Sequence, residues 1–141
     1  KGYRHWGHDV SPEDDPFEAG LDFVLKLDKP AEFIGQAALA AKRERPLSRR
    51  LVSFRLQDPA PLLIGHEPIY RAGVVAGWIT SGAYGHSVGG AIGLGYVACD
   101  APADPARVLD ATLQIDVAGR RLAADGAPAP KTTAQFTGRP R

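Results

Sequence analysis

Short segments in which apolar and polar residues alternate run from residue 49 onward and constrain the fold more than any other feature. The clearest covers residues 109–117, where every second residue is apolar. A period of two places alternate side chains on opposite faces of a strand, one face buried and one solvated. Val52, Phe54 and Leu56 repeat this pattern. The sequence therefore predicts a mainly β unit.

Glycine separates these segments and indicates where the predicted sheet turns. Ala72-Gly73 lies between two strand-like segments and predicts a hairpin. Residues 82–90 contain four glycines and are predicted to form a loop. Gly93 and Gly95 lie inside the next alternating segment, where glycine marks a bend or a close approach of two backbones. Several short strands with such turns favour a small antiparallel barrel.

The first 45 residues show a different pattern. Residues 21–27 alternate in apolar character and predict a strand. Residues 35–45 are rich in alanine and other good helix formers, and Pro46 follows them, so a helix is expected there. We therefore expect a strand–helix segment at the end of an α+β domain (residues 1–45), followed by the barrel (residues 46–141).

Composition and charge exclude several classes of protein. The chain has 141 residues and a net charge of +1, which gives no electrostatic case for binding nucleic acids or anionic membranes, because both need clustered basic charge. No apolar run approaches the roughly 20 residues that span a bilayer. Cys99 is the single cysteine, which excludes an internal disulfide and fits a reducing compartment. The chain contains no methionine, and we expect it to be a piece of a longer polypeptide.

The opening segment carries the most chemistry. His5 and His8 are three residues apart beside Asp9, but the glycines around them oppose a helix and no third ligand lies nearby, so we do not expect a metal site. A polar loop in which one histidine bonds a partner or ligand is the preferred interpretation. Trp6 is either a core ring or a flat wall for a heteroaromatic ligand. The residue types leave both open, core packing being the commoner role.

Three ordered motifs resemble the aminomethyltransferase family, to which the glycine cleavage T-protein belongs. They are residues 2–9 (GYRHWGHD), 16–21 (PFEAGL) and 33–35 (FIG), and residues 79–82 (ITSG) resemble a later motif of that family. The first motif is most similar to the C-terminal folate domains of dimethylglycine and sarcosine dehydrogenases. In those flavoproteins an N-terminal FAD domain oxidises an N-methyl amine, and the C-terminal half captures the one-carbon unit on tetrahydrofolate.

The resemblance implies that this chain is the end of such a C-terminal half. Residues 1–45 would finish the folate-binding domain, and residues 46–141 would form the family's Greek-key barrel. Tetrahydrofolate would be the cofactor, with FAD bound only by an upstream domain. The expected partners are folate and the upstream domains of the same chain, with no nucleic acid, membrane or metal. The expected location is the cytoplasm of a bacterium or the mitochondrial matrix of a eukaryote.

The resemblance also suggests which residues contact folate. Trp6 falls where T-proteins have an aromatic residue that lines the folate pocket, and Tyr3 and His5 are its neighbours. Arg139 is the candidate for the glutamate tail of folate, because a guanidinium binds a carboxylate through two hydrogen bonds. The family's catalytic aspartate lies upstream of Lys1, so we expect no catalytic residue here and no activity from this piece alone. Two alternatives remain: a T-protein-like aminomethyltransferase, or a non-catalytic barrel used for packing between domains.

Overall fold

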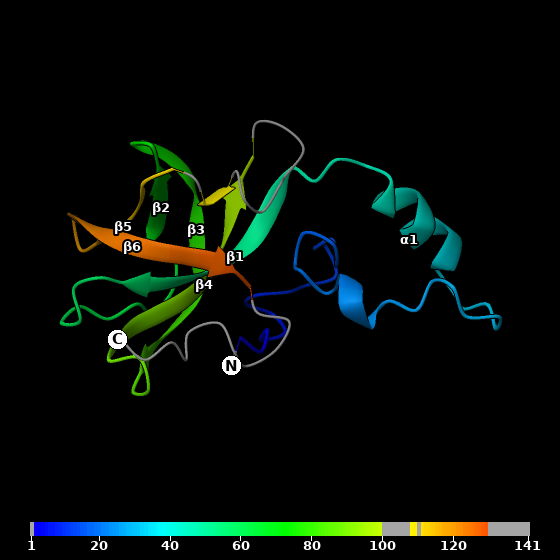
Figure 1. Cartoon of the computed structure of the whole chain (residues 1–141), viewed down its shortest axis with the longest axis horizontal. Helices are drawn as coiled ribbons and strands as arrows, with labels where there is room; N and C mark the ends of the chain where they lie inside the picture. The colour runs from blue at the N-terminus through cyan, green and yellow to red at the C-terminus, as the bar shows by residue number, and fades with distance from the viewer. Residues whose placement is uncertain (1, 100–107, 110, 130–141) are drawn as a thin grey trace, which may run out of the picture.

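A computed structural model describes residues 2–99, 108–109 and 111–129, and its main feature is a closed six-stranded barrel (Figure 1). The strands are β1 (Arg49–Leu56), β2 (Pro68–Arg71), β3 (Val74–Gly85), β4 (Gly90–Ala98), β5 (Leu113–Val117) and β6 (Arg120–Pro128). All neighbours pair antiparallel in the order β1-β4-β3-β2-β5-β6, and β6 closes on β1. Because β2, β3 and β4 are consecutive and β5 returns beside β2, the topology is a Greek key. The predicted barrel is confirmed.

The barrel interior holds the apolar residues that the alternation predicted. Val52 and Phe54 of β1 point inward and are buried, as are Ile69, Ile79 and Ile115 from three other strands. Burial of each such side chain contributes about 1.5–3 kcal/mol relative to exposure. The alternation of Val52, Phe54 and Leu56 therefore predicted correctly which side of β1 faces the barrel interior.

Glycine has the two roles that the sequence indicated. Ala72 and Gly73 have φ values of 50° and 83°, which is the type I′ turn of a two-residue hairpin between β2 and β3. A Cβ atom on Gly95 would lie 2.6 Å from the backbone oxygen of Trp78, so β4 can approach β3 closely only without a side chain there. Both predictions are confirmed.

Two predicted boundaries in the barrel are wrong. Residues 82–90 are not all loop, since Gly85 pairs with Gly90 and only residues 86–89 remain as the turn. Pairing along two long strands outweighs the low strand propensity of glycine. The predicted strand at 109–117 begins only at Leu113, and the helical residue Val108 fills the barrel core instead.

The strand predicted at residues 21–27 is also wrong. Asp22–Val24 form a short 3₁₀ helix, η1, and Phe23 and Val24 are exposed. A strand needs a neighbour to satisfy its backbone groups, and no described segment pairs with residues 21–27. Alternation therefore predicted a strand for which the described chain offers no partner.

The predicted helix is confirmed as α1 (Gln36–Arg43), which follows Gly35 at a φ of 89°. All eight of its residues are described, and none is buried. Figure 1 places α1 to one side of the barrel. No helix among the described residues is long and apolar enough to cross a membrane.

Candidate functional site

The N-terminal residues cover the outer face of the barrel. Leu51 of β1 and Leu94 and Tyr96 of β4 are buried outside the barrel core, because side chains alternate between the two faces of each strand. They form a second apolar cluster with Ala19, against which Val10 packs. Residues 2–20 are thus attached directly to the barrel, ahead of the projecting η1 and α1.

Asp9 is the centre of this attachment. Its side chain is buried, and the residue is 1% exposed. Oδ1 accepts hydrogen bonds from Thr80 Oγ1 and from Ser81 Oγ, the latter at 2.7 Å, and Oδ2 accepts one from the His5 backbone N–H at 2.8 Å. The Tyr96 hydroxyl donates to the Asp9 carbonyl oxygen at 3.0 Å. The motif at residues 2–9 therefore contacts the motif at residues 79–82.

A β-bulge explains how two consecutive side chains reach one carboxylate. In a regular strand, Thr80 and Ser81 would point to opposite faces. The register shifts between Ile79, which faces Gly95, and Ser81, which faces Leu94. The extra residue of the bulge turns the strand locally, so both hydroxyls can donate to Asp9 Oδ1.

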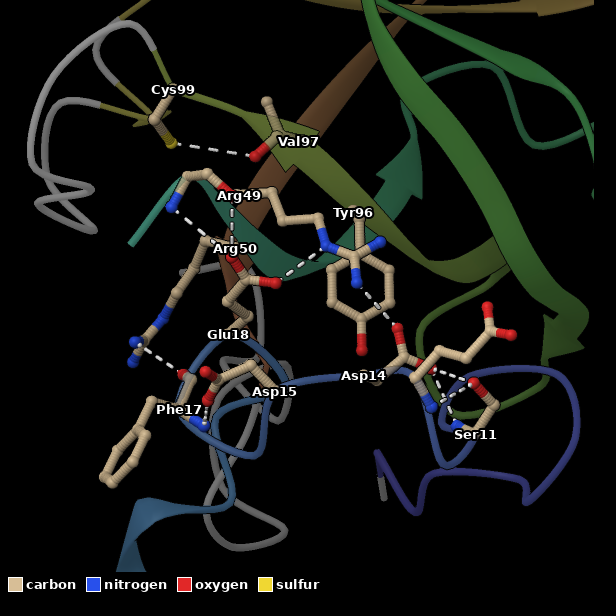
Figure 2. Close-up of polar contacts among 12 residues, drawn as sticks. Ser11, Asp14, Asp15, Phe17, Glu18, Arg49, Arg50, Tyr96, Val97 and Cys99 are labelled. Carbon is tan, nitrogen blue, oxygen red and sulfur yellow. Dashed lines mark hydrogen bonds and ion pairs between the residues drawn. The ribbon is translucent and has the colours of Figure 1, made fainter. Parts of the chain in front are cut away.

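A second set of polar contacts joins the same segment to β1 (Figure 2). Arg49 donates from Nε to Glu18 Oε2 at 2.7 Å and from Nη2 to Asp14 Oδ1 at 2.8 Å. Ser48 Oγ donates to the other oxygen of Glu18 at 2.8 Å. The Arg49 guanidinium also lies 4.4 Å from the centre of the Tyr96 ring.

Burial and charge set the protonation states in this region. Burial opposes the charge of Arg49, but the hydrogen bond and the charge of Glu18, with that of Asp14, outweigh it and raise the pKa of Arg49. Burial, with the nearby negative charge of Asp14, raises the pKa of Tyr96 to about 12, although Arg49 acts in the opposite direction. Tyr96 therefore keeps the proton that it donates to Asp9.

The rings predicted to contact a ligand lie on the surface. Trp6 is 68% exposed and Tyr3 is 81% exposed, and His5 is exposed as well. Trp6 is thus not a core ring in the described structure. The rings of His5 and His8 lie 4.6 Å apart. Arg139 lies outside the described residues.

The backbone that carries these rings is well anchored. The Gly7 N–H donates to the Val10 carbonyl at 2.8 Å, and the Asp9 N–H donates to the His5 carbonyl at 2.8 Å, which closes a tight turn around Trp6. The Arg4 side chain donates to the backbone oxygens of Gly2, Ala19 and Gly20. Burial lowers the pKa of Arg4.

These features decide what the site can hold. Trp6 is an exposed indole on an anchored turn and offers a flat face of the kind on which a heteroaromatic ring stacks. Asp9 accepts hydrogen bonds from its own chain at both carboxylate oxygens, and those from Thr80 and Ser81 hold the N-terminal residues against the barrel. Among the described residues, no group of three or more His, Cys, Asp or Glu side chains could hold a metal ion.

Sequence reasoning missed the residues that build this attachment, namely Asp9, Thr80, Ser81, Glu18 and Arg49. One signal was present. Thr80 and Ser81 are adjacent polar residues that interrupt an apolar strand, which is how a bulge that presents side chains to a partner can appear in a sequence.

Comparison with known proteins identifies similar chains. The model of the glycine cleavage T-protein C-terminal barrel domain matches residues 49–131. A 4-methylaminobutanoate oxidase (formaldehyde-forming) from Paenarthrobacter nicotinovorans is 43% identical over 101 residues, which are 72% of this chain and 12% of the oxidase. The mitochondrial sarcosine dehydrogenase of Homo sapiens is 43% identical over 97 residues, 69% of this chain and 10% of that protein.

Two further matches extend over more of the chain. An aminomethyltransferase from Saccharopolyspora erythraea is 37% identical over 118 residues, 84% of this chain and 31% of the enzyme. The crystal structure of the glycine cleavage system aminomethyltransferase T from Bartonella henselae superposes with a TM-score of 0.73 at 22% identity. That match covers 96% of this chain and 37% of the other, and it shows a shared fold. The chain thus spans between 10% and 31% of the length of these curated relatives.

Proposed function

The chain belongs to the family of the glycine cleavage T-protein C-terminal barrel domain, and from this premise we propose that it forms the C-terminal part of a folate-dependent one-carbon transfer unit. The parent protein would be an FAD-dependent dehydrogenase of the dimethylglycine or sarcosine type that passes the oxidised methyl group to tetrahydrofolate. The sarcosine dehydrogenase and the oxidase, each 43% identical over the matched residues, support this choice.

The observation that carries the proposal is an exposed Trp6 on a turn held by a buried carboxylate. Trp6 would form a wall against which the pterin stacks, with Tyr3 and His5 at its edge. Arg139 would bind the glutamate tail. Tetrahydrofolate, when bound, supplies the acceptor for the one-carbon unit. The residues of this chain would bind and orient it, while the catalytic aspartate would come from upstream chain.

The segment that carries η1 and α1 would contact another part of the parent protein. Ile34, Phe23 and Val24 are exposed, and no residue of α1 is buried. Ile, Phe and Val are among the residue types most often found buried in folded proteins. We therefore assign residues 1–45 to the end of the folate-binding domain, whose upstream portion would pack against η1 and α1.

One observation favours a second candidate, a T-protein-like aminomethyltransferase without an oxidase domain. The aminomethyltransferase relative matches over 118 residues, whereas the sarcosine dehydrogenase match covers 97. An FAD-binding glycine motif upstream of Lys1 would favour the dehydrogenase, because an aminomethyltransferase without an oxidase domain does not bind FAD.

Titration calorimetry with 5-formyltetrahydrofolate tests the folate proposal. We expect Trp6→Ala to weaken binding about tenfold, since it removes the stacking face, and Trp6→Phe to retain most of the affinity. Trp78→Ala is the matched control, because Trp78 is another indole that is more than half exposed. Affinity that is unchanged in Trp6→Ala would assign Trp6 to packing between domains and would favour the non-catalytic barrel.

A further inference from the structure

We infer that Asp9 and the Thr80/Ser81 bulge form a positioning device that holds the Trp6 indole in its ligand-binding orientation. These residues would not touch the ligand, so they are positioning residues. The ligand-binding part of this role rests on the proposed function. The anchoring of Trp6 by Asp9 can be tested without any ligand.

The buried Asp9 carboxylate needs hydrogen-bond donors from the barrel. Moving a carboxylate out of water costs free energy unless hydrogen-bond donors of the protein replace the solvent. At 1% exposure Asp9 depends on the hydroxyls of Thr80 and Ser81, which belong to a strand more than 70 residues away in sequence. While residues 2–9 lie against the barrel, Thr80 and Ser81 donate these hydrogen bonds to the Asp9 carboxylate. If residues 2–9 moved away from the barrel, both hydrogen bonds would break.

Asp9 is hydrogen-bonded to the turn that carries the indole. Asp9 Oδ2 accepts from the His5 N–H, and the Asp9 N–H donates to the His5 carbonyl, so the two residues close the turn that carries Trp6. The indole itself is 68% exposed and has little packing of its own. The backbone turn therefore fixes where the indole is attached, and the two hydrogen bonds between Asp9 and His5 help to close that turn.

The bulge in β3 presents both hydroxyls to Asp9. A regular strand would present only one of the two hydroxyls to this face, whereas the shifted register between Ile79 and Ser81 presents both. Two donors on one carboxylate oxygen restrict the rotation of the Asp9 side chain more than one donor does. The bulge thus both attaches residues 2–9 to the barrel and restricts their position.

The experiment uses the full chain with Trp78→Phe, which leaves Trp6 as its single tryptophan. Thr80→Val removes one hydroxyl with little change of shape, Thr80→Ser keeps it, and Ser87→Ala removes an exposed hydroxyl in the β3–β4 turn as a control. The fluorescence anisotropy of Trp6 and the affinity for 5-formyltetrahydrofolate are measured at a temperature where circular dichroism shows every variant folded.

We expect Thr80→Val to lower the anisotropy of Trp6 and to weaken ligand binding by up to about tenfold, since the lost hydrogen bond to a charged group lowers the fraction of chains in which the turn holds Trp6 in place. Thr80→Ser should restore both values, and Ser87→Ala should leave both unchanged. Should Thr80→Val fail to fold, Ser81→Ala takes its place with the same expectations.

A folded Thr80→Val variant with unchanged anisotropy and unchanged affinity would overturn the inference. If the chain with intact Thr80 does not bind 5-formyltetrahydrofolate, the proposal that Trp6 binds the ligand within this chain is refuted instead. In that case the anisotropy alone decides the anchoring role: a drop in Thr80→Val that Thr80→Ser reverses supports it, and an unchanged value refutes it.

Discussion

Gly82 follows the bulge in β3, and its replacement by alanine is expected to destabilise the barrel strongly. A Cβ atom at this position would lie 2.2 Å from the carbonyl oxygen of Leu63 and 2.7 Å from its Cβ. These atoms belong to a backbone whose side chain is buried in the barrel core, so they cannot move away cheaply. Overpacking of a core costs about 1–3 kcal/mol. Because the backbone must shift here, we expect Gly82→Ala to lower the free energy of unfolding by about 3 kcal/mol.

Gly90→Ala is the matched control, since the nearest atom to its added Cβ is the Leu56 carbonyl oxygen at an ordinary 3.6 Å. Alanine at such a position should be neutral or stabilise by up to about 1 kcal/mol. For a chain of this length, a loss of about 3 kcal/mol lowers Tm by roughly 10 °C. Thermal unfolding followed by circular dichroism measures both variants. Equal Tm values for Gly82→Ala and Gly90→Ala would refute the close approach of β3 to Leu63.

Two further predictions concern the polar contacts of the N-terminal segment. Glu18→Gln removes the charge that Arg49 pairs with at 2.7 Å, and we expect urea unfolding to show a loss of about 1–3 kcal/mol. Raising the pH above 10 should destabilise the chain, because the pKa of Tyr96 is raised from 10.0 to about 12 and the folded state then binds the proton more tightly than the unfolded state. Stability is complete below pH about 10 and falls as the pH rises through about 12. One pKa unit is worth about 1.36 kcal/mol, so the total loss is on the order of 3 kcal/mol.

Each of these predictions has a control. Arg120→Gln removes an exposed partner of Asp58 at 4.0 Å and should change stability by less than about 0.5 kcal/mol. A Glu18→Gln variant no less stable than Arg120→Gln would contradict the role given to Glu18. For the pH effect, unfolding measured between pH 9 and 12 should show a smaller decline in Tyr96→Phe, and an equal decline would assign the effect to other groups.

The barrel could be predicted from the sequence because its signals are local. Alternation in residues 52–56 marks an inward face, and Ala72-Gly73 fits a two-residue turn whatever lies elsewhere in the chain. The segment at 21–27 shows the limit of the same rule. Its alternation is equally regular, but a strand also needs a neighbour, and pairing is not a local property.

The attachment of the N-terminal segment could not be predicted for a related reason. Asp9 and Thr80 are separated by 71 positions, and the bulge that lets Thr80 and Ser81 act together is visible only in the register of β3 against β4. The exposure of Trp6 also could not be derived from residue types, which favoured core packing. The resemblance to a known family directed attention to this ring, and the geometry of Asp9 explains how it is held.

The most direct test of the account follows the indole N–H resonance of Trp6 by NMR while 5-formyltetrahydrofolate is added to the ¹⁵N-labelled chain. The chain has two tryptophans, and Trp6→Phe assigns the two indole signals. The account predicts a saturable shift of the Trp6 signal that is weaker in Thr80→Val and recovers in Thr80→Ser. Saturable binding that leaves the Trp6 signal unmoved would contradict it.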